Sequence, residues 1–227
     1  MNKKIKLTTI LVSLLAVLQV SCQQVEPKKS KTNNNITPVE VASSDGFKRA
    51  YFASGCFWCV EAIYESLIGV EESISGYSGG HTKNPTYESS NTGKTGHAEA
   101  VEIIYNPNVI SFKILVDVYF ESQNISQVNG QGNDRGSQYR SIIFYQNMEE
   151  KNIIANKIKA LYKENSDRKV AAEVMPFQKF WIAEKYHQDY ERLHPNNSYI
   201  QNVSIPRLKR FQNKFPELLK ENSKHEE

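Results

Sequence analysis

Two cysteines spaced as Cys-x-x-Cys, Cys56 and Cys59, are the most reactive side chains that this sequence places close together. They follow a short β-rich run and Gly55, and they open an apolar pattern with helical spacing. A thiol in the first turn of a helix lies near unpaired backbone N–H groups and the positive end of the helix dipole. Both favour the thiolate, so Cys56 is predicted to be a nucleophile.

The Cys-x-x-Cys spacing is compatible with a redox pair, with half of a zinc site or with two small buried residues. Zinc is disfavoured because the chain has only one further cysteine, Cys22, and therefore no second pair. The five histidines show no close ligand spacing either, and we expect no bound metal. From the residues alone, the redox and packing interpretations both remain open.

The elements that must position these thiols alternate along the chain, which predicts an α/β (α+β) fold. The order β-α-β-β-α-β with a further helix and strand is typical of a two-layer, split βαβ, ferredoxin-like sandwich with an extra C-terminal helix. Residues 79–96 and 122–138 lack a regular pattern and are expected to be long active-site loops. The expected strands are 48–53, 70–77, 98–105, 139–145 and 169–175, and the expected helices are 57–67, 112–120, 148–162 and 184–193.

Six motifs in order make the chain resemble the A-type peptide methionine sulfoxide reductases, which reduce the S epimer of methionine sulfoxide. The resemblance runs from about Arg49 to Asn197. The motifs are GCFWCVE at 55–61, GYSGG at 76–80, NPTY at 84–87, TGHAEAV at 95–101, QGNDRGSQYR at 131–140 and AEKYHQDY at 183–190.

The resemblance implies a catalytic role for residues around the first cysteine. Cys56 matches the nucleophile that attacks the sulfoxide sulfur and becomes a sulfenic acid. Phe57 and Trp58 match an aromatic wall that receives the S-methyl group of the substrate. Glu99 matches the acid that protonates the sulfoxide oxygen, a role that requires burial to raise its pKa. Without the resemblance, Glu99 would be read as a strand residue facing solvent.

Four further positions acquire roles from the same resemblance. Tyr87 and Tyr139 match catalytic phenols that polarise the sulfoxide oxygen, and Asp134 matches a carboxylate of the substrate pocket. His187 falls on a motif position expected to support the substrate-binding residues. Taken singly, the tyrosines would be read as packing residues, Asp134 as a turn residue and His187 as a helix-surface residue.

The recycling of the sulfenic acid departs from the family pattern. Many members carry a C-terminal resolving cysteine after a Pro-Asn-x-Tyr segment, but here Pro195–Tyr199 is followed by Ile200, and no cysteine follows Cys59. Either Cys59 resolves the sulfenic acid, for which one helical turn is a feasible span, or an outside thiol reduces Cys56 directly. The remaining alternative makes Cys59 a buried packing residue. We expect no bound cofactor and an external reductant, either thioredoxin-like or a small thiol.

The N-terminus resembles a bacterial lipoprotein signal. Residues 1–21 carry three lysines and an apolar run too short for an ordinary bilayer span, and Cys22 would become the lipidated first residue. Gln19 departs from the leucine usual at that position. We expect residues 22–46 to be a flexible tether, 47–216 the reductase domain and 217–227 a polar tail. The expected location is the bacterial cell envelope, as a membrane-anchored lipoprotein or a periplasmic protein.

The balance of basic and acidic residues argues against a nucleic-acid partner. The chain has 28 basic and 25 acidic residues, and loss of the three leader lysines would leave 25 of each. A nucleic-acid binder needs a surplus of clustered cations, so that class is unlikely on charge alone. We expect a monomer that repairs oxidised methionine, in proteins and free. The alternatives are a thiol–disulfide oxidoreductase that uses Cys56 and Cys59, and a non-catalytic domain that binds methionine-containing peptides.

Overall fold

The computed structural model describes residues 36–167 and 169–223. The expected export signal at 1–21, the lipidation site Cys22 and most of the expected tether therefore lie outside the described residues. Within the described ranges, no helix is long and apolar enough to cross a membrane.

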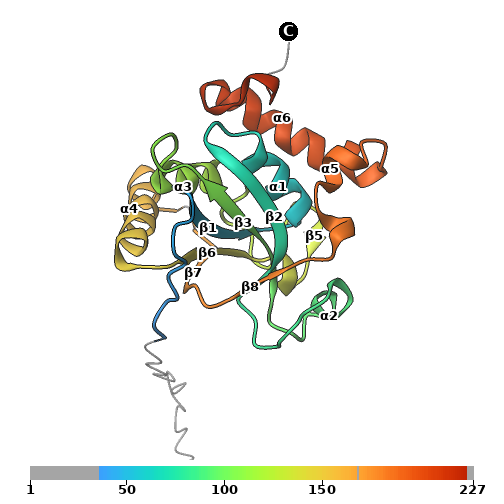
Figure 1. Ribbon diagram of the computed structural model, residues 1–227, viewed down its shortest axis with the longest axis horizontal. Helices are drawn as coiled ribbons and strands as arrows, with labels where there is room; N and C mark the ends of the chain where they lie inside the picture. Colours follow the sequence, from blue (N-terminus) through green and yellow to red (C-terminus); the bar gives the residue numbers. More distant parts are fainter. Residues whose placement is uncertain (1–35, 168, 224–227) are drawn as a thin grey trace, which may run out of the picture. The chain divides into compact units, whose positions relative to one another are not determined.

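A six-stranded sheet organises the fold, with the strand order β7-β6-β1-β3-β2-β8 (Figure 1). Every neighbouring pair is antiparallel except β6 and β7, which are parallel. The strands are β1 (Lys48–Ser54), β2 (Val70–Ser78), β3 (Ala98–Tyr105), β6 (Ser141–Tyr145), β7 (Glu173–Pro176) and β8 (Phe180–Ile182). A separate hairpin pairs β4 (Gly130–Gln131) with β5 (Asp134–Arg135).

Two βαβ units interleave in the centre of this sheet. Helix α1 (Phe57–Glu65) connects β1 to β2, and β3 lies between those two strands. Helix α3 (Phe112–Glu121) lies between β3 and β6 in the chain, and β1 separates those strands in the sheet. The expected α/β class is confirmed, and β7 and β8 extend the sheet at its two edges. This interleaving brings the end of β1, where the Cys-x-x-Cys pair begins, next to the start of β3.

Both faces of the sheet are buried, which explains why its central strands are apolar on both sides. Ala50 and Phe52 of β1 pack with α1 and α3 on one face. Their neighbours Tyr51 and Ala53 point to the opposite face, where Tyr51 stacks on Phe177 with ring centroids 3.8 Å apart. The second face is covered by extended segments, so the fold is a sheet with helices mainly on one side.

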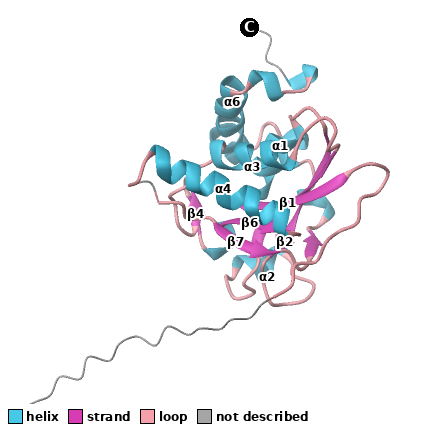
Figure 2. Cartoon of the chain, turned by 90° about the vertical axis from the view of Figure 1, so that its left-hand side faces the viewer, coloured by secondary structure: helices cyan, strands magenta, loops and turns pink. Residues whose placement is uncertain are grey.

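Side-chain caps define the longer helices. Ser111 Oγ accepts the backbone N–H of Ile114 at the start of α3, and Asn147 Oδ1 accepts that of Glu150 at the start of α4 (Met148–Glu164). Such caps satisfy N–H groups that have no partner within the helix. Figure 2 shows α3 and α4 side by side. A π-helical turn (Ile200–Ser204) leads into α6 (Ile205–Lys214), which packs on α1 and which we did not expect from the sequence.

The helix expected at 184–193 is wrong. The chain forms a 3-10 turn (Lys185–His187) and a short helix α5 (Tyr190–Leu193), separated by an extended Gln188 and a left-handed Asp189 with φ 54°. The reason is tertiary bonding: the Gln188 amide bonds both backbone groups of Ser75, and the Asp189 N–H donates to a carboxylate oxygen of Glu61 at 2.5 Å. These bonds replace the ones a continuous helix would make.

The two stretches expected to lack regular structure contain short elements. Helix α2 (Tyr87–Asn91) lies in the first stretch, and a capping box between Thr86 and Ser89 caps its N-terminus. The β4–β5 hairpin and a 3-10 turn (Ser137–Tyr139) lie in the second. The strand expected at 139–145 therefore begins at Ser141, and the one expected at 169–175 begins at Glu173.

Both expected boundaries of the folded part lie inside packed segments. At the N-terminal side, the Val39 N–H donates to Phe177 O at 2.8 Å, and Val41 packs against the second face of the sheet. At the C-terminal side, Leu219 is 2% exposed and bridges to Leu67. Two 3-10 turns, Pro216–Leu218 and Glu221–Ser223, complete the described chain. Leu219 thus belongs to the core, whereas Glu217 is exposed.

Candidate active site

A glycine turn delivers Cys56 from the end of β1 to the start of α1. Gly55 has φ +83°, a conformation that side chains disfavour, and a Cβ there would lie 2.6 Å from Gln131 Cβ. Cys56 is the N-cap residue of α1 and is 5% exposed. Only glycine fits this turn, so the GC sequence fixes where the thiol can lie.

Glu99 lies against the backbone beside that thiol. Its Oε2 accepts the backbone N–H of Phe57 at 3.1 Å, and the residue is 2% exposed. Burial raises the pKa of Glu99 to about 8, with the Phe57 N–H opposing the shift and the nearby Asp134 and Cys59 adding to it. Burial thus favours the protonated form of this carboxyl near neutral pH.

The two thiols are buried together, and the structure corrects the expectation of a resting Cys56 thiolate. Burial raises the pKa of the Cys56 thiol well above its ordinary value. The hydrogen bond from Cys56 and the positive charge of Arg207 lower the pKa of Cys59 to about 7, against the effect of its own burial. The main cause is burial, to which the neighbouring Cys59 and Glu99 add, and no hydrogen bond from the helix start offsets it because the Phe57 N–H donates to Glu99. The nearby Arg207 charge thus favours the thiolate form of Cys59, while burial disfavours that of Cys56.

Tyr199 links the thiols to Asp134. Its hydroxyl donates to Asp134 Oδ2 at 2.7 Å and lies 3.7 Å from Cys59 Sγ. The β4–β5 hairpin presents Asp134 from the other side. Sequence reasoning missed Tyr199, although it belongs to the Pro-Asn-x-Tyr segment that marks where the resolving cysteine usually follows.

The expected phenols Tyr87 and Tyr139 lie together and near the thiol. Each hydroxyl affects the pKa of the other, and the charges of Glu99 and Cys56 act on both. Burial raises the pKa of each hydroxyl, so both remain neutral hydrogen-bond donors. Tyr87 is the first residue of α2, and its N–H donates to Glu184 at 2.9 Å. Sequence reasoning did not select Glu184, which also accepts the Tyr77 hydroxyl.

The aromatic residues form a continuous stack around His187. Trp58 stacks on Tyr190 with centroids 3.8 Å apart, and the His187 ring lies 4.9 Å from Phe57 and 4.5 Å from Tyr87. Trp58 Nε1 donates to His187 Nδ1 at 3.2 Å. His187 is 1% exposed and burial lowers its pKa, so the ring is neutral. It packs against Phe57 and accepts the Trp58 N–H, and so supports the aromatic wall that these two residues form.

Arg207 ties helix α6 to the turn that carries Cys56. Its guanidinium donates to Ser54 O at 3.0 Å, to Ser54 Oγ at 3.1 Å and to Ser122 O at 2.9 Å. Nothing in the sequence singled it out, because α6 was not expected.

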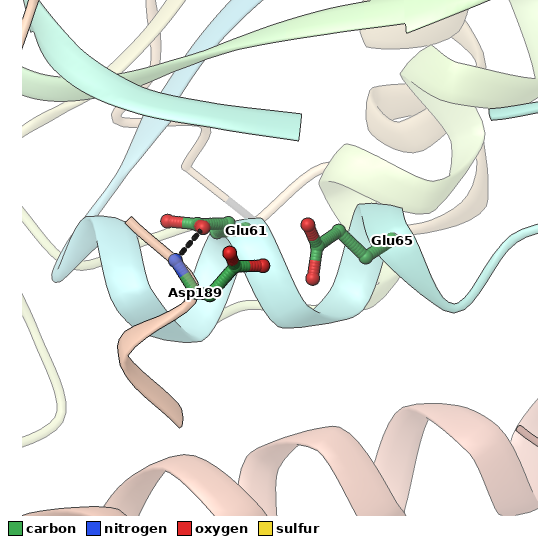
Figure 3. Close-up of side chains that lie close together, drawn as sticks. All are labelled: Glu61, Glu65 and Asp189. Atoms are coloured by element: carbon green, nitrogen blue, oxygen red, sulfur yellow. Dashed lines mark hydrogen bonds between the residues drawn. The ribbon is translucent and has the colours of Figure 1, made fainter. Parts of the chain in front are cut away.

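Three carboxylates outside this site meet on the outer side of α1 (Figure 3). Oxygens of Glu61, Glu65 and Asp189 lie within 4.8 Å of one another. Burial raises the pKa of Glu61 to about 8 and that of Glu65 to about 7. Glu61 accepts the Ser75 hydroxyl and the Asp189 N–H, while Asp189 pairs with Arg192 at 2.8 Å. The cluster therefore joins α1 to the irregular segment after the 3-10 turn.

The chain matches known proteins over most of its described length. The family model for peptide methionine sulfoxide reductase matches residues 48–219. The peptide methionine sulfoxide reductase MsrA of Pasteurella multocida is 44% identical over 173 residues, which are 76% of this chain and 99% of the relative. That of Sulfolobus acidocaldarius is 45% identical over 168 residues, 74% and 95% of the two chains.

Solved structures show the same fold. Methionine sulfoxide reductase A of Corynebacterium diphtheriae superposes with a TM-score of 0.61 at 29% identity, covering 72% of this chain and 84% of the other. The reduced form of Mxr1 from Saccharomyces cerevisiae gives the same TM-score and identity, covering 71% and 93%.

Proposed function

The chain belongs to the peptide methionine sulfoxide reductases, and we propose that Cys56 is the nucleophile with which it reduces methionine sulfoxide. The observation that carries this assignment is the buried Glu99 carboxyl, held by the Phe57 N–H directly beside the thiol. A carboxyl with a raised pKa can donate a proton where a negatively charged oxygen develops. Thiol–disulfide exchange develops negative charge on sulfur rather than on oxygen, so an acid placed to protonate an oxygen favours sulfoxide reduction.

The first half-reaction transfers oxygen from the substrate to Cys56. The proton of the Cys56 thiol moves along its hydrogen bond to Cys59, and Cys56 Sγ attacks the sulfoxide sulfur. Glu99 protonates the sulfoxide oxygen, and Tyr87 and Tyr139 donate hydrogen bonds to it. The protonated oxygen then moves from the substrate sulfur to Cys56 Sγ. A Cys56 S–O bond forms while the substrate S–O bond and the transient bond between the two sulfurs break, so methionine leaves as the thioether and Cys56 is left as a sulfenic acid.

The wall formed by Phe57 and Trp58 supplies substrate selectivity. A flat apolar surface receives the S-methyl group, while the acid and the phenols lie on the side of the oxygen. Together with the direction from which Cys56 attacks, these two requirements fix the arrangement around a chiral sulfur, so the site accepts one epimer, which we propose is the S epimer. His187 and Tyr190 keep the Trp58 ring in place.

The second half-reaction uses Cys59. Cys59, which holds the proton taken from Cys56, passes that proton to the sulfenic acid oxygen and attacks Cys56 Sγ, so water leaves and a Cys56–Cys59 disulfide forms. An external thiol, either a small molecule or a thioredoxin-like protein, then returns the pair to its reduced form. Ile200, where family members often have the resolving cysteine, has no thiol and cannot take part.

We propose further that the mature protein is lipidated at Cys22 and works in the cell envelope. The support is the charged and apolar leader before Ser21 and Cys22. Expression in a bacterial host with labelled fatty acid should label the wild type and leave Cys22→Ala unlabelled. A freely soluble, unlabelled wild-type product would contradict the lipidation.

Steady-state assays on peptide epimers test the reductase assignment. With dithiothreitol, the wild type should reduce the S-sulfoxide peptide and leave the R-sulfoxide unchanged, and Cys56→Ser should lose activity. Activity in Cys56→Ser above a few per cent of wild type would overturn the assignment of the nucleophile.

A further inference from the structure

We propose that a pocket between α6 and residues 121–134 binds a small thiol that carries a carboxylate and delivers it to Cys59. The inference rests on the proposed function, because it concerns the step that regenerates the enzyme. The pocket has a volume of about 500 Å³, and Cys59 lines it together with Gln131, Val203, Arg207, Arg210 and Lys214.

The pocket reaches the cysteine pair at Cys59, and of the proposed substrate contacts only Asp134 lines it. Among the described residues that line it, none is Phe57, Trp58, Tyr87 or Glu99. A molecule in this pocket would therefore meet Cys59 rather than Cys56. Cys59 lies beside the thiolate-stabilising Arg207, whose position is fixed by bonds to Ser54 and Ser122.

The charge of the pocket favours an anion. In the described part of the chain, the guanidinium groups of Arg207 and Arg210 have no carboxylate partner, whereas Lys214 pairs with Glu121 at 2.5 Å. Guanidinium groups suit carboxylates because they offer several N–H donors in a fixed planar arrangement. The lining also contains Glu121, which pairs with Lys214, and Asp134, which accepts the Tyr199 hydroxyl. With three cations against two carboxylates, the pocket keeps a net positive charge beside a buried thiol, which fits a small reductant with an acidic group.

The regeneration chemistry balances with two such thiols. The first, as thiolate, attacks Cys59 Sγ in the Cys56–Cys59 disulfide, and Cys56 leaves as the thiolate and takes up a proton. The second attacks the external sulfur of the resulting mixed disulfide and releases Cys59. Two small thiols are oxidised to one disulfide for each methionine sulfoxide reduced, with water formed in the preceding step.

Helix α6 offers a matched pair of variants for the test. Arg210 lines this pocket, whereas its neighbour Lys209 lines a different pocket next to Glu61 and Trp58. Each variant, Arg210→Gln or Lys209→Gln, removes one positive charge. The full-length protein is first oxidised with one equivalent of S-sulfoxide peptide. It is then mixed with 3-mercaptopropionate or with the neutral 2-mercaptoethanol, and the second-order rate constant of reduction is measured.

We expect Arg210→Gln to slow reduction by 3-mercaptopropionate about two- to fivefold, as the loss of one exposed charge contact implies. Reduction by 2-mercaptoethanol should not change, and Lys209→Gln should not change with either thiol. Added salt should reduce the advantage of the anionic thiol in the wild type. Equal effects of the two variants, or no effect of Arg210→Gln, would refute the pocket.

The amount of methionine formed in the oxidation step distinguishes failure of the proposed function from failure of the thiol-binding pocket. One equivalent of methionine with no dependence on Arg210 would leave the proposed function intact and overturn the inference. No methionine would overturn the proposed function itself. In Cys56→Ser, the symmetrical disulfide of 3-mercaptopropionate should form a mixed disulfide at Cys59, detected by intact mass. If this thiol regenerates Cys59→Ser as fast as wild type, the pocket is not its route.

Discussion

Replacing Glu99 by glutamine removes the proposed proton donor without removing its volume. With a pKa of about 8, roughly 90% of Glu99 is protonated at pH 7, compared with about 0.3% for a carboxyl at its ordinary value of 4.5. Burial thus raises the fraction of the acid form about 300-fold. Since general-acid catalysis typically contributes about 10²–10⁴-fold, Glu99→Gln should slow sulfoxide reduction by at least two orders of magnitude at pH 7.

Single-turnover rates measured from pH 6 to pH 10 check both the size and the sign of this effect. The wild-type rate should fall as pH rises through 8, because Glu99 loses the proton that it must donate. The Glu99→Gln rate should lack this fall, so the two profiles should approach each other at high pH. The side chain at position 99 also accepts the Phe57 N–H, which the glutamine oxygen can still do. A rate for Glu99→Gln within threefold of wild type at pH 7 would refute the reasoning.

Three further substitutions test other parts of the site. Cys59→Ser should still form one equivalent of methionine but leave a sulfenic acid, and its recycling by a protein disulfide reductant should slow at least tenfold; intact mass and thiol titration distinguish the two products. Tyr199→Phe removes the donor to Asp134 and a hydrogen bond that lowers the pKa of Cys59, so thiol alkylation should require a higher pH and the first turnover should slow about tenfold. Glu61→Gln should change how stability depends on pH, because a folded-state pKa raised to about 8 means that wild-type stability falls as pH rises from 4.5 to 8. In urea unfolding, the free energy of unfolding of the variant relative to wild type should rise by about 1–3 kcal/mol from pH 5 to pH 9. A difference that stays constant with pH would contradict the raised pKa.

The alternating apolar patterns predicted the central strands and the long helices well, because both faces of the sheet and one stripe of each helix are buried. Motif order then placed Cys56, Glu99 and the tyrosines, which come from distant segments and meet in the structure. Local pattern failed where tertiary bonds decide the backbone. The segment 184–193 looks helical, yet Gln188 and Asp189 bond to Ser75 and Glu61 rather than to the preceding turn.

Electrostatics was the hardest part to predict. The first-turn position of Cys56 suggested a stabilised thiolate, but the neighbouring N–H donates to Glu99 and burial dominates. The charge that lowers the pKa of Cys59 comes from Arg207, a residue 148 positions later on a helix that the pattern did not reveal. Sequence spacing carries no information on which distant cation faces a buried thiol.

Single-turnover formation of methionine without any reductant tests the central claim most directly. One equivalent of S-sulfoxide peptide is mixed with the reduced wild type and with Cys56→Ser, and methionine peptide and free thiols are counted. The account predicts about one methionine per wild-type chain, with loss of the Cys56 and Cys59 thiols, and none for Cys56→Ser. Equal methionine yields from the two proteins, or no methionine from the wild type, would contradict it.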